Sequence, residues 1–117
     1  MAIKALSGFA PYWYTPKSQI KDPDPTRFKV HKLNGEQMGN VRPELSFNAL
    51  GDMDITGRGL TLTLIYGLDD WENFCDDQGP VKAVLENHCL IHVADRVELA
   101  TEIIKASTLG EESRKNS

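Results

Sequence analysis

Three residues that could bind a metal lie close together near residue 90, at His88, Cys89 and His92. Zinc in proteins is usually held by four nitrogen or sulfur ligands arranged as a tetrahedron. On a helix the two histidines would share a face, but the remaining cysteine, Cys75, stands alone. The second paired motif that makes such a pattern specific is absent. We therefore interpret Cys89 as a small buried residue between partly exposed imidazoles, and predict no metal and no cofactor.

The segment YGLDDWENFCDDQG, residues 66–79, surrounds Trp71 and Phe74 with carboxylates. These oxygens suit calcium, but the spacing of an EF-hand loop is absent. Acid–base catalysis requires carboxylates held in a pocket with shifted pKa values, whereas these acids are expected in a solvated turn. We interpret the segment as structural: Trp71 and Phe74 pack at the edge of the core, and the acids keep the connecting turn in water.

Other classes of function are disfavoured by motif and charge. The glycines form neither a nucleophile elbow nor a dinucleotide or phosphate loop. A net charge of −4 argues against nucleic acid. No apolar run is long enough to span a membrane, and residues 1–10 lack the core of a secretory signal. We predict a non-enzymatic protein in a reducing cytoplasm, without nucleic-acid or membrane partners and with free thiols at Cys75 and Cys89.

The length of 117 residues and the hydrophobic fraction of 40% suit one domain with one modest core. We predict a small single α+β domain, in which a short N-terminal β-structure with a proline-rich aromatic arm precedes three to four helices. The expected parts are an arm at residues 1–25, a core domain at 26–107 and a polar tail at 108–117.

The arm carries most of the prolines, at positions 11, 16, 23 and 25. Proline lacks an N–H and restricts the residue before it, so the arm cannot be helix and is a poor strand. Tyr12, Trp13 and Tyr14 are three adjacent rings, which are costly to leave in water. They form either a lid on the domain's own core or an epitope for a partner, since aromatic clusters suit binding hot spots.

Alternation in TRFKVHKL, residues 26–33, predicts a half-buried strand. The Asn34–Gly35 pair that follows fits a hairpin turn or a helix start capped by Asn34 and Gln37. We prefer a helix over 35–42. Residues 57–68 are ambiguous, because leucines alternating with threonines indicate a strand while the same leucines also form a helical stripe.

Two more helices are expected further along the chain. Trp71 and Phe74 are three residues apart, so a helical turn over 69–75 would place both rings on one face. Residues 92–107 give the clearest helical pattern, with an apolar stripe and no glycine or proline. The stripe consists of Val93, Val97, Ala100 and Ile104, widened by Leu99, Ile103 and Ala106.

Four stretches, taken in order, resemble one protein family. They are TPKSQIKDPDPTRFKVHKLNGEQ (15–37), TGRGLTLTLIYGLDDWENF (56–74), VELATEIIKAS (97–107) and EESRKNS (111–117). This set is similar to the small tail assembly chaperone-type proteins of long-tailed bacteriophages. The resemblance implies a helix over 57–67. The chain departs from the family pattern in residues 79–93, which lack an expected Leu-Pro and carry His88 and Cys89 instead.

The resemblance implies a protein of the host cytoplasm that is absent from the mature virion. Such a chaperone binds the tape measure protein before the tube forms and recruits tail tube protein subunits. No family motif assigns contact residues, so the candidates are chosen for their chemistry: Tyr12, Trp13, Tyr14, Trp71 and Phe74. Self-association stays open. The alternative is a phage accessory protein that binds and inhibits a host protein, which would also be small and acidic.

Overall fold

The computed structural model describes the backbone of residues 2–116 and the side chains of residues 2–108. The helices are α1 (Gly35–Val41), α2 (Gly57–Gly67) and α3 (Val93–Asn116), with short 3-10 helices η1 (Lys17–Gln19), η2 (Arg42–Glu44) and η3 (Leu85–Leu90). The strands are β1 (Tyr12–Tyr14), β2 (Arg27–Val30), β3 (Leu45–Phe47), β4 (Met53–Ile55), β5 (Leu68–Glu72), β6 (Cys75–Asp76) and β7 (Gly79–Pro80). This small single α+β domain confirms the predicted fold class.

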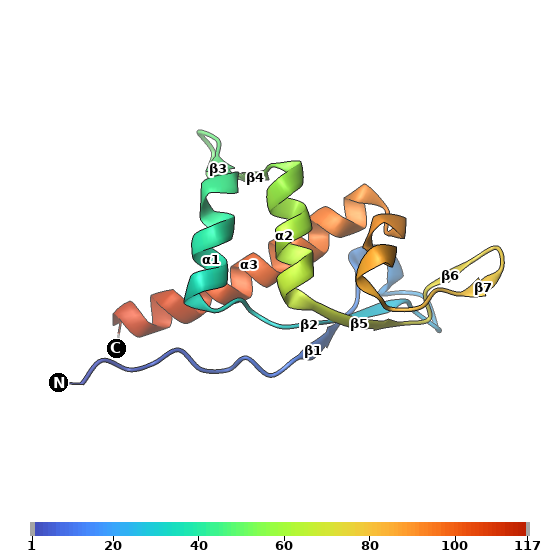
Figure 1. The fold of residues 1–117 in the computed structure, drawn as a ribbon, viewed down its shortest axis with the longest axis horizontal. Helices are drawn as coiled ribbons and strands as arrows, with labels where there is room; N and C mark the ends of the chain where they lie inside the picture. The colour runs from blue at the N-terminus through green and yellow to red at the C-terminus, as the bar shows by residue number, and fades with distance from the viewer. Residues whose placement is uncertain (1, 117) are drawn as a thin grey trace.

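An antiparallel sheet in the order β1-β2-β5 lies beneath the helices (Figure 1). One row across it joins Tyr14, Phe28 and Trp71, and this face packs against α3. The neighbouring row joins Trp13, Lys29 and Asp70. Because successive side chains of a strand point to opposite faces, this second row forms the outer face of the sheet, away from α3.

The core lies between the inner face of the sheet and the three α-helices. α3 runs along the length of the molecule, and α2 packs across it beside α1 (Figure 1). The side chains buried most completely come from all of these layers: Val30, Leu33, Val41, Leu64, Leu99 and Ile103. A single core therefore holds strand β2 and helices α1, α2 and α3 together.

The Asn34–Gly35 pair starts a helix, as preferred from the sequence. The Asn34 side chain accepts a hydrogen bond from the Gln37 N–H at 2.9 Å, and Gln37 Oε1 accepts one from the Asn34 N–H at 3.1 Å. This reciprocal capping box satisfies N–H groups that the first turn of a helix leaves unpaired.

The ambiguous segment 57–68 forms helix α2 up to Gly67, which confirms the helical alternative. The helix buries Leu60 and Leu64, and the Thr63 hydroxyl is buried without cost because it donates to the Gly59 carbonyl at 2.8 Å. Leu68 then begins β5. The buried residues Leu60, Thr63 and Leu64 follow the helical period, so the leucines serve helical packing.

The helix predicted over residues 69–75 is wrong. Residues Leu68–Glu72 form strand β5, whose backbone pairs with β2 so that Trp71 lies opposite Phe28. Asn73 then adopts a left-handed conformation at φ 55°, which asparagine tolerates better than most residues. This turn brings Phe74 beside Trp71, so the rings do meet, but through a strand and a turn.

Both ends of the chain contain more regular structure than expected. The arm contributes β1 to the sheet, because Tyr12–Tyr14 pair with Phe28–Val30, although prolines at 11 and 16 flank the strand. At the other end α3 extends beyond residue 107 to Asn116, within the segment predicted as a polar tail. The helix predicted over 92–107 is confirmed as the first part of α3.

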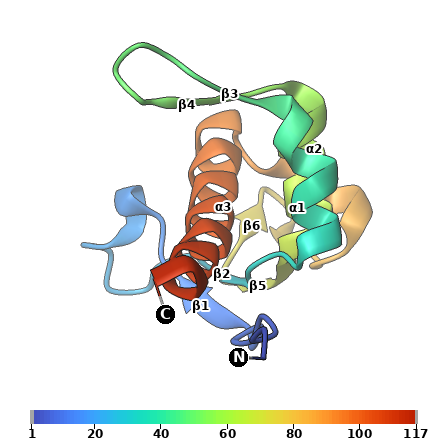
Figure 2. The ribbon, with the colours of Figure 1, turned by 90° about the vertical axis from the view of Figure 1, so that its left-hand side faces the viewer.

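A hairpin formed by β3 and β4 projects from the end of the molecule near α1 and α2 (Figure 2). Leu45, Met53 and Ile55 pack partly against the core at its base. Its loop, residues 48–52, is exposed.

Candidate protein-binding surface

Trp71 belongs to the core and is only 7% exposed. Its ring centroid lies 6.1 Å from that of Phe28 and 5.3 Å from that of Phe74, with edge-on geometry in both pairs. The indole Nε1 donates to the Val81 carbonyl at 2.8 Å. This agrees with the structural interpretation of the segment and leaves Trp71 with little exposed surface of its own. Phe74 is partly buried in the same cluster.

Tyr12 and Tyr14 fasten β1 to α3. The Tyr12 hydroxyl donates to Glu102 at 2.8 Å, and the Tyr14 hydroxyl donates to Glu98 at 2.6 Å. Burial, reinforced by these carboxylates, raises the pKa of both phenols above the usual range, so they stay protonated as donors. The sequence left two roles open for the aromatic residues of the arm, a lid on the domain's own core or an epitope for a partner. The contacts of these two tyrosines with α3 fit the first role.

Trp13 points the other way and is 38% exposed on the outer face of the sheet. Arg27 and Lys29 lie over its ring, with the guanidinium carbon and the ammonium nitrogen 5.4 Å and 5.8 Å from the ring centroid. Arg27 is also paired with Glu72. Trp13 thus remains accessible, while the five candidate rings do not form one surface.

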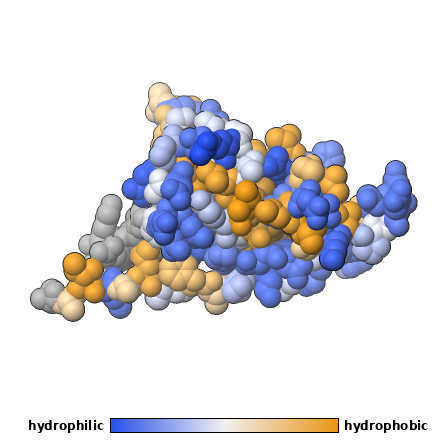
Figure 3. Space-filling view, viewed as in Figure 1, coloured by the Kyte–Doolittle hydropathy of each residue, from blue (hydrophilic) through white to orange (hydrophobic). Residues whose placement is uncertain are grey.

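Exposed apolar residues gather over α2, η3 and the first turns of α3, with hydrophilic residues between them (Figure 3). We call this surface the apolar face; its exposed members are Ile65, Leu85, Leu90, Val93 and Val97. Val93 is 67% exposed and Leu85 59%. Single exposed apolar residues are ordinary on proteins, but a group of large ones marks an interaction site more often than an isolated residue does.

The apolar face contains a small groove of about 140 Å³. Its lining combines apolar residues with carboxylates and an imidazole, and more of the lining surface is polar than apolar: Ile65, Leu68, Asp69, Asp70, Trp71, Ala83, Val84, Leu85 and His88. Small-molecule sites usually measure about 300–1,000 Å³. This groove is smaller than that and could hold only part of a side chain from a partner. Asp69 and Asp70 place negative charge at its border.

Sequence reasoning placed Val93 and Val97 in the buried stripe of the last helix, and for them it was wrong. The buried part of α3 begins at Leu99 and Ala100. α2 has 11 residues and α3 has 24, so the shorter helix cannot cover the longer one throughout. That difference in length indicates that α2 leaves part of the stripe uncovered, but it does not indicate which part. Leu85 and Leu90 carried no comparable signal.

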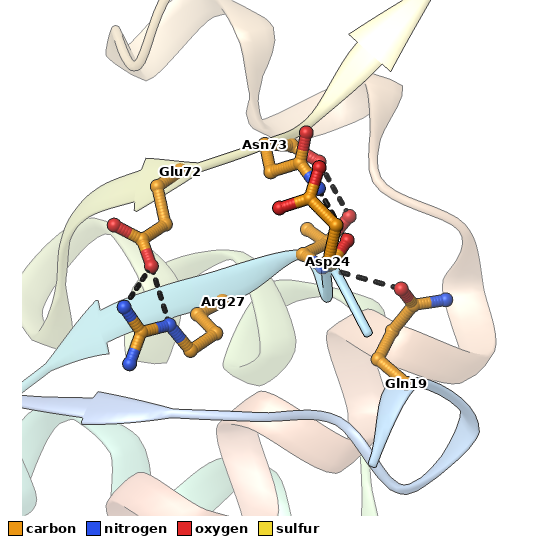
Figure 4. A network of polar contacts seen from close by, with 6 residues as sticks. Gln19, Asp24, Arg27, Glu72 and Asn73 are labelled. Carbon is orange, nitrogen blue, oxygen red and sulfur yellow. Dashed lines mark hydrogen bonds and ion pairs between the residues drawn. The ribbon is translucent and has the colours of Figure 1, made fainter. Parts of the chain in front are cut away.

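A polar network joins the arm to the turn after β5 (Figure 4). Gln19 Oε1 accepts from the Thr26 N–H at 3.2 Å, and the Thr26 hydroxyl donates to the Asn73 carbonyl at 2.6 Å. Asn73 in turn donates to the Asp24 carbonyl. These bonds border an open groove of about 780 Å³. Its charged lining residues are Asp24, Arg27 and Glu72. Arg27 and Glu72 are paired with each other, and the Asp24 backbone accepts from Asn73, so the arrangement serves to hold the arm.

The histidine and cysteine residues do not form a metal centre within the part of the chain that the structure describes. Cys75 and Cys89 are both free and exposed, so the expectation of a buried Cys89 was wrong. The reason is local: η3 turns the Cys89 thiol outward, where it lies 3.3 Å from the Glu86 carbonyl. No helix among the described residues is both long enough and apolar enough to span a bilayer.

His88 makes stability depend on pH. Burial, with a contribution from the Arg96 guanidinium, lowers the pKa of this imidazole below its ordinary value of about 6.5. The unfolded chain therefore binds the proton at higher pH than the folded chain does. Stability from this residue is complete above about pH 6.5 and is lost as pH falls through the folded pKa.

We expect the free energy of unfolding to fall between pH 7.5 and pH 5, and to fall less in His88→Gln. Urea denaturation at both pH values measures this difference. His31, which lies 2.7 Å from Asp69, is present in both proteins, so the comparison isolates His88. An equal pH dependence in both proteins would contradict the assignment to His88.

Comparisons with protein-family models, with curated protein sequences and with solved structures found no match to this chain.

Proposed function

We propose that this chain is a non-enzymatic tail assembly chaperone of a long-tailed bacteriophage, which binds the tape measure protein and helps to recruit tail tube subunits. The observation that carries the binding role is the apolar face, where Leu85, Leu90 and Val93 are more than half exposed. Exposed side chains of this kind are suited to covering apolar surface on another polypeptide. The ordered resemblance of four sequence stretches supports the particular partner.

The chemistry of the apolar face favours an amphipathic helix as the bound segment. The groove beside Ile65 and Leu85 has room for part of one apolar side chain of the partner. The exposed apolar side chains around the groove can contact partner residues three or four positions before or after that side chain. Asp69 and Asp70 at the groove border favour a lysine or arginine next to the apolar anchor. A tape measure protein, which is long and helical, offers such segments repeatedly.

The experiment is co-expression of the chain with a fragment of the tape measure protein from the same genome. We expect more soluble fragment in the presence of the chain, and co-purification of the two. The double variant Leu85→Asp/Val93→Asp should lose at least a factor of about 10 in affinity, which corresponds to roughly 1.4 kcal/mol.

The matched control is Ile20→Asp, because Ile20 is a similarly exposed apolar residue outside the apolar face. It should bind like the unchanged protein, and circular dichroism should show that all variants are folded. Failure of the unchanged chain to solubilise or retain the fragment would overturn the proposal. It would leave the alternative of a phage accessory protein that binds a host factor.

A further inference from the structure

The projecting β3–β4 hairpin presents apolar side chains that neither the core nor the apolar face uses. Phe47 is 67% exposed and Leu50 is 87% exposed. The groove of the apolar face includes neither residue. The hairpin tip is thus a separate surface at another end of the molecule (Figures 1 and 2).

The hairpin tip is held in one conformation by its own hydrogen bonds. Asn48 Oδ1 accepts from the N–H groups of Leu50 and Asp52, each at 2.9 Å. The Asn48 backbone N–H donates to the Asp52 carbonyl at 3.0 Å, and Gly51 supplies a turn at φ 84°. A preorganised loop loses less conformational entropy when it binds, so the exposed Phe47 and Leu50 are suited to docking.

The charge of the hairpin tip is negative. Asp52 and Asp54 flank the loop, and residues 45–57 contain no lysine or arginine. Neither aspartate has an ion pair among the described residues. This charge disfavours nucleic acid and anionic lipid as occupants. It also disfavours the apolar face of another copy, which is bordered by Asp69 and Asp70.

The complementary surface is the outer face of the sheet around Trp13. There Lys29 lies over the exposed Trp13 ring. Beyond the end of β2, Lys32 lies 5.0 Å from the centroid of the partly buried Phe9 ring. Among the described side chains neither lysine has a carboxylate within ion-pair distance. This surface therefore combines the exposed Trp13 ring with two ammonium groups that are opposite in charge to the aspartates of the hairpin tip, although Asp70 lies opposite Lys29 on the same face.

We propose that the hairpin tip of one copy of this chain docks on the Trp13 surface of a second copy. Phe47 and Leu50 contact the Trp13 ring, and Asp52 and Asp54 approach Lys29 and Lys32. The two surfaces lie on opposite sides of the molecule, with the hairpin above the helices and β1 below them (Figure 1).

Such a contact is heterologous, since it joins different surfaces of identical chains. It therefore continues from copy to copy, as an open chain or a closed ring. Copies joined in this way would present their apolar faces repeatedly, which suits a long helical polypeptide. That consequence rests on the proposed function, whereas the contact itself does not.

The test uses the purified chain alone, in analytical ultracentrifugation at low salt over a range of protein concentrations. We expect the average mass to rise with concentration and the rise to weaken at high salt. The hairpin variant Phe47→Ser/Leu50→Ser and the sheet variant Lys29→Glu should each stay monomeric. Ile20→Ser, which removes an exposed apolar side chain elsewhere, should associate like the unchanged chain.

Mixing the two monomeric variants distinguishes head-to-tail docking from other modes of association. The hairpin variant retains an intact Trp13 surface, and the sheet variant retains an intact hairpin tip, so one contact can form between them. An equimolar mixture should therefore give a heterodimer and nothing larger. The proposal is overturned by a monomeric unchanged chain at every concentration, by association of either variant alone, or by a mixture that stays monomeric. Binding of a tape measure fragment is measured separately, so failure of one proposal does not decide the other.

Discussion

Replacing Trp71 with alanine is expected to remove about 3–5 kcal/mol from the free energy of unfolding. The side chain is almost fully buried and packs against Phe28 and Phe74. Its indole also satisfies the Val81 carbonyl, which connects β5 to the segment after the β6–β7 hairpin. The change removes a large volume from the core and one hydrogen bond. The free energy of unfolding of a domain of this size is about 5–15 kcal/mol. The substitution is therefore expected to remove a large part of it.

The matched control for this prediction is Trp13→Ala, which deletes the same side chain from the outer face of the sheet. It should cost about 1 kcal/mol or less, since a surface substitution leaves no cavity. Trp71→Phe should fall between the two, because it keeps a ring in the cluster but leaves the Val81 carbonyl without its donor. Urea denaturation measures all three. Equal losses for Trp71→Ala and Trp13→Ala would show that the cluster does not stabilise the fold as inferred.

The features predicted correctly from the sequence depend on residues close together in the chain. The capping box of Asn34 and Gln37 spans four residues, and it fixes the start of α1. The helical pattern of residues 92–107 likewise repeats within a few turns, and it gives the first part of α3. Local hydrogen bonding and periodicity can be predicted from a sequence because they depend only on residues close together in the chain.

The features that were predicted wrongly depend on partners far away in the chain. Residues 69–75 carry helical spacing, yet pairing with β2 across more than 35 positions makes them strand and turn. Tyr12–Tyr14 lie between prolines, yet pairing with β2 makes them a strand. In both segments β2 provides hydrogen bonds that local preference does not anticipate, because tertiary context overrides weak intrinsic propensity.

The candidate site was predicted only in part for a related reason. An aromatic residue is equally suited to a core and to an interface, and the sequence cannot distinguish Trp71, which is buried, from Trp13, which is exposed. Conversely, Val93 was assigned to the core because it lies on an apolar stripe, yet no neighbouring element covers it. Burial depends on how far each covering element extends, so a binding surface becomes visible only after the elements are packed.

Replacing Gly67 with alanine is expected to destabilise the protein by about 2–3 kcal/mol, although alanine favours helices. A Cβ at this position would lie 2.8 Å from Ile103 Cγ2 and 3.0 Å from the His31 carbonyl oxygen. Ile103 is fully buried in α3, and His31 is hydrogen-bonded through its N–H to the Gly67 carbonyl at 2.9 Å. Neither neighbour can move away without disturbing the junction of α2, α3 and the end of β2.

Gly39→Ala is the matched control, since it adds the same methyl group to a helical glycine with open space around it. It should stabilise the protein by about 0.5–1 kcal/mol, because alanine loses less backbone entropy than glycine in a helix. Thermal denaturation followed by circular dichroism would show the two variants shifting in opposite directions. A Gly67→Ala protein as stable as Gly39→Ala would mean that α2 and α3 are not as closely packed at Gly67 as described. Such loosening would also alter the position of Ile65, so the geometry of the apolar face depends on this close approach.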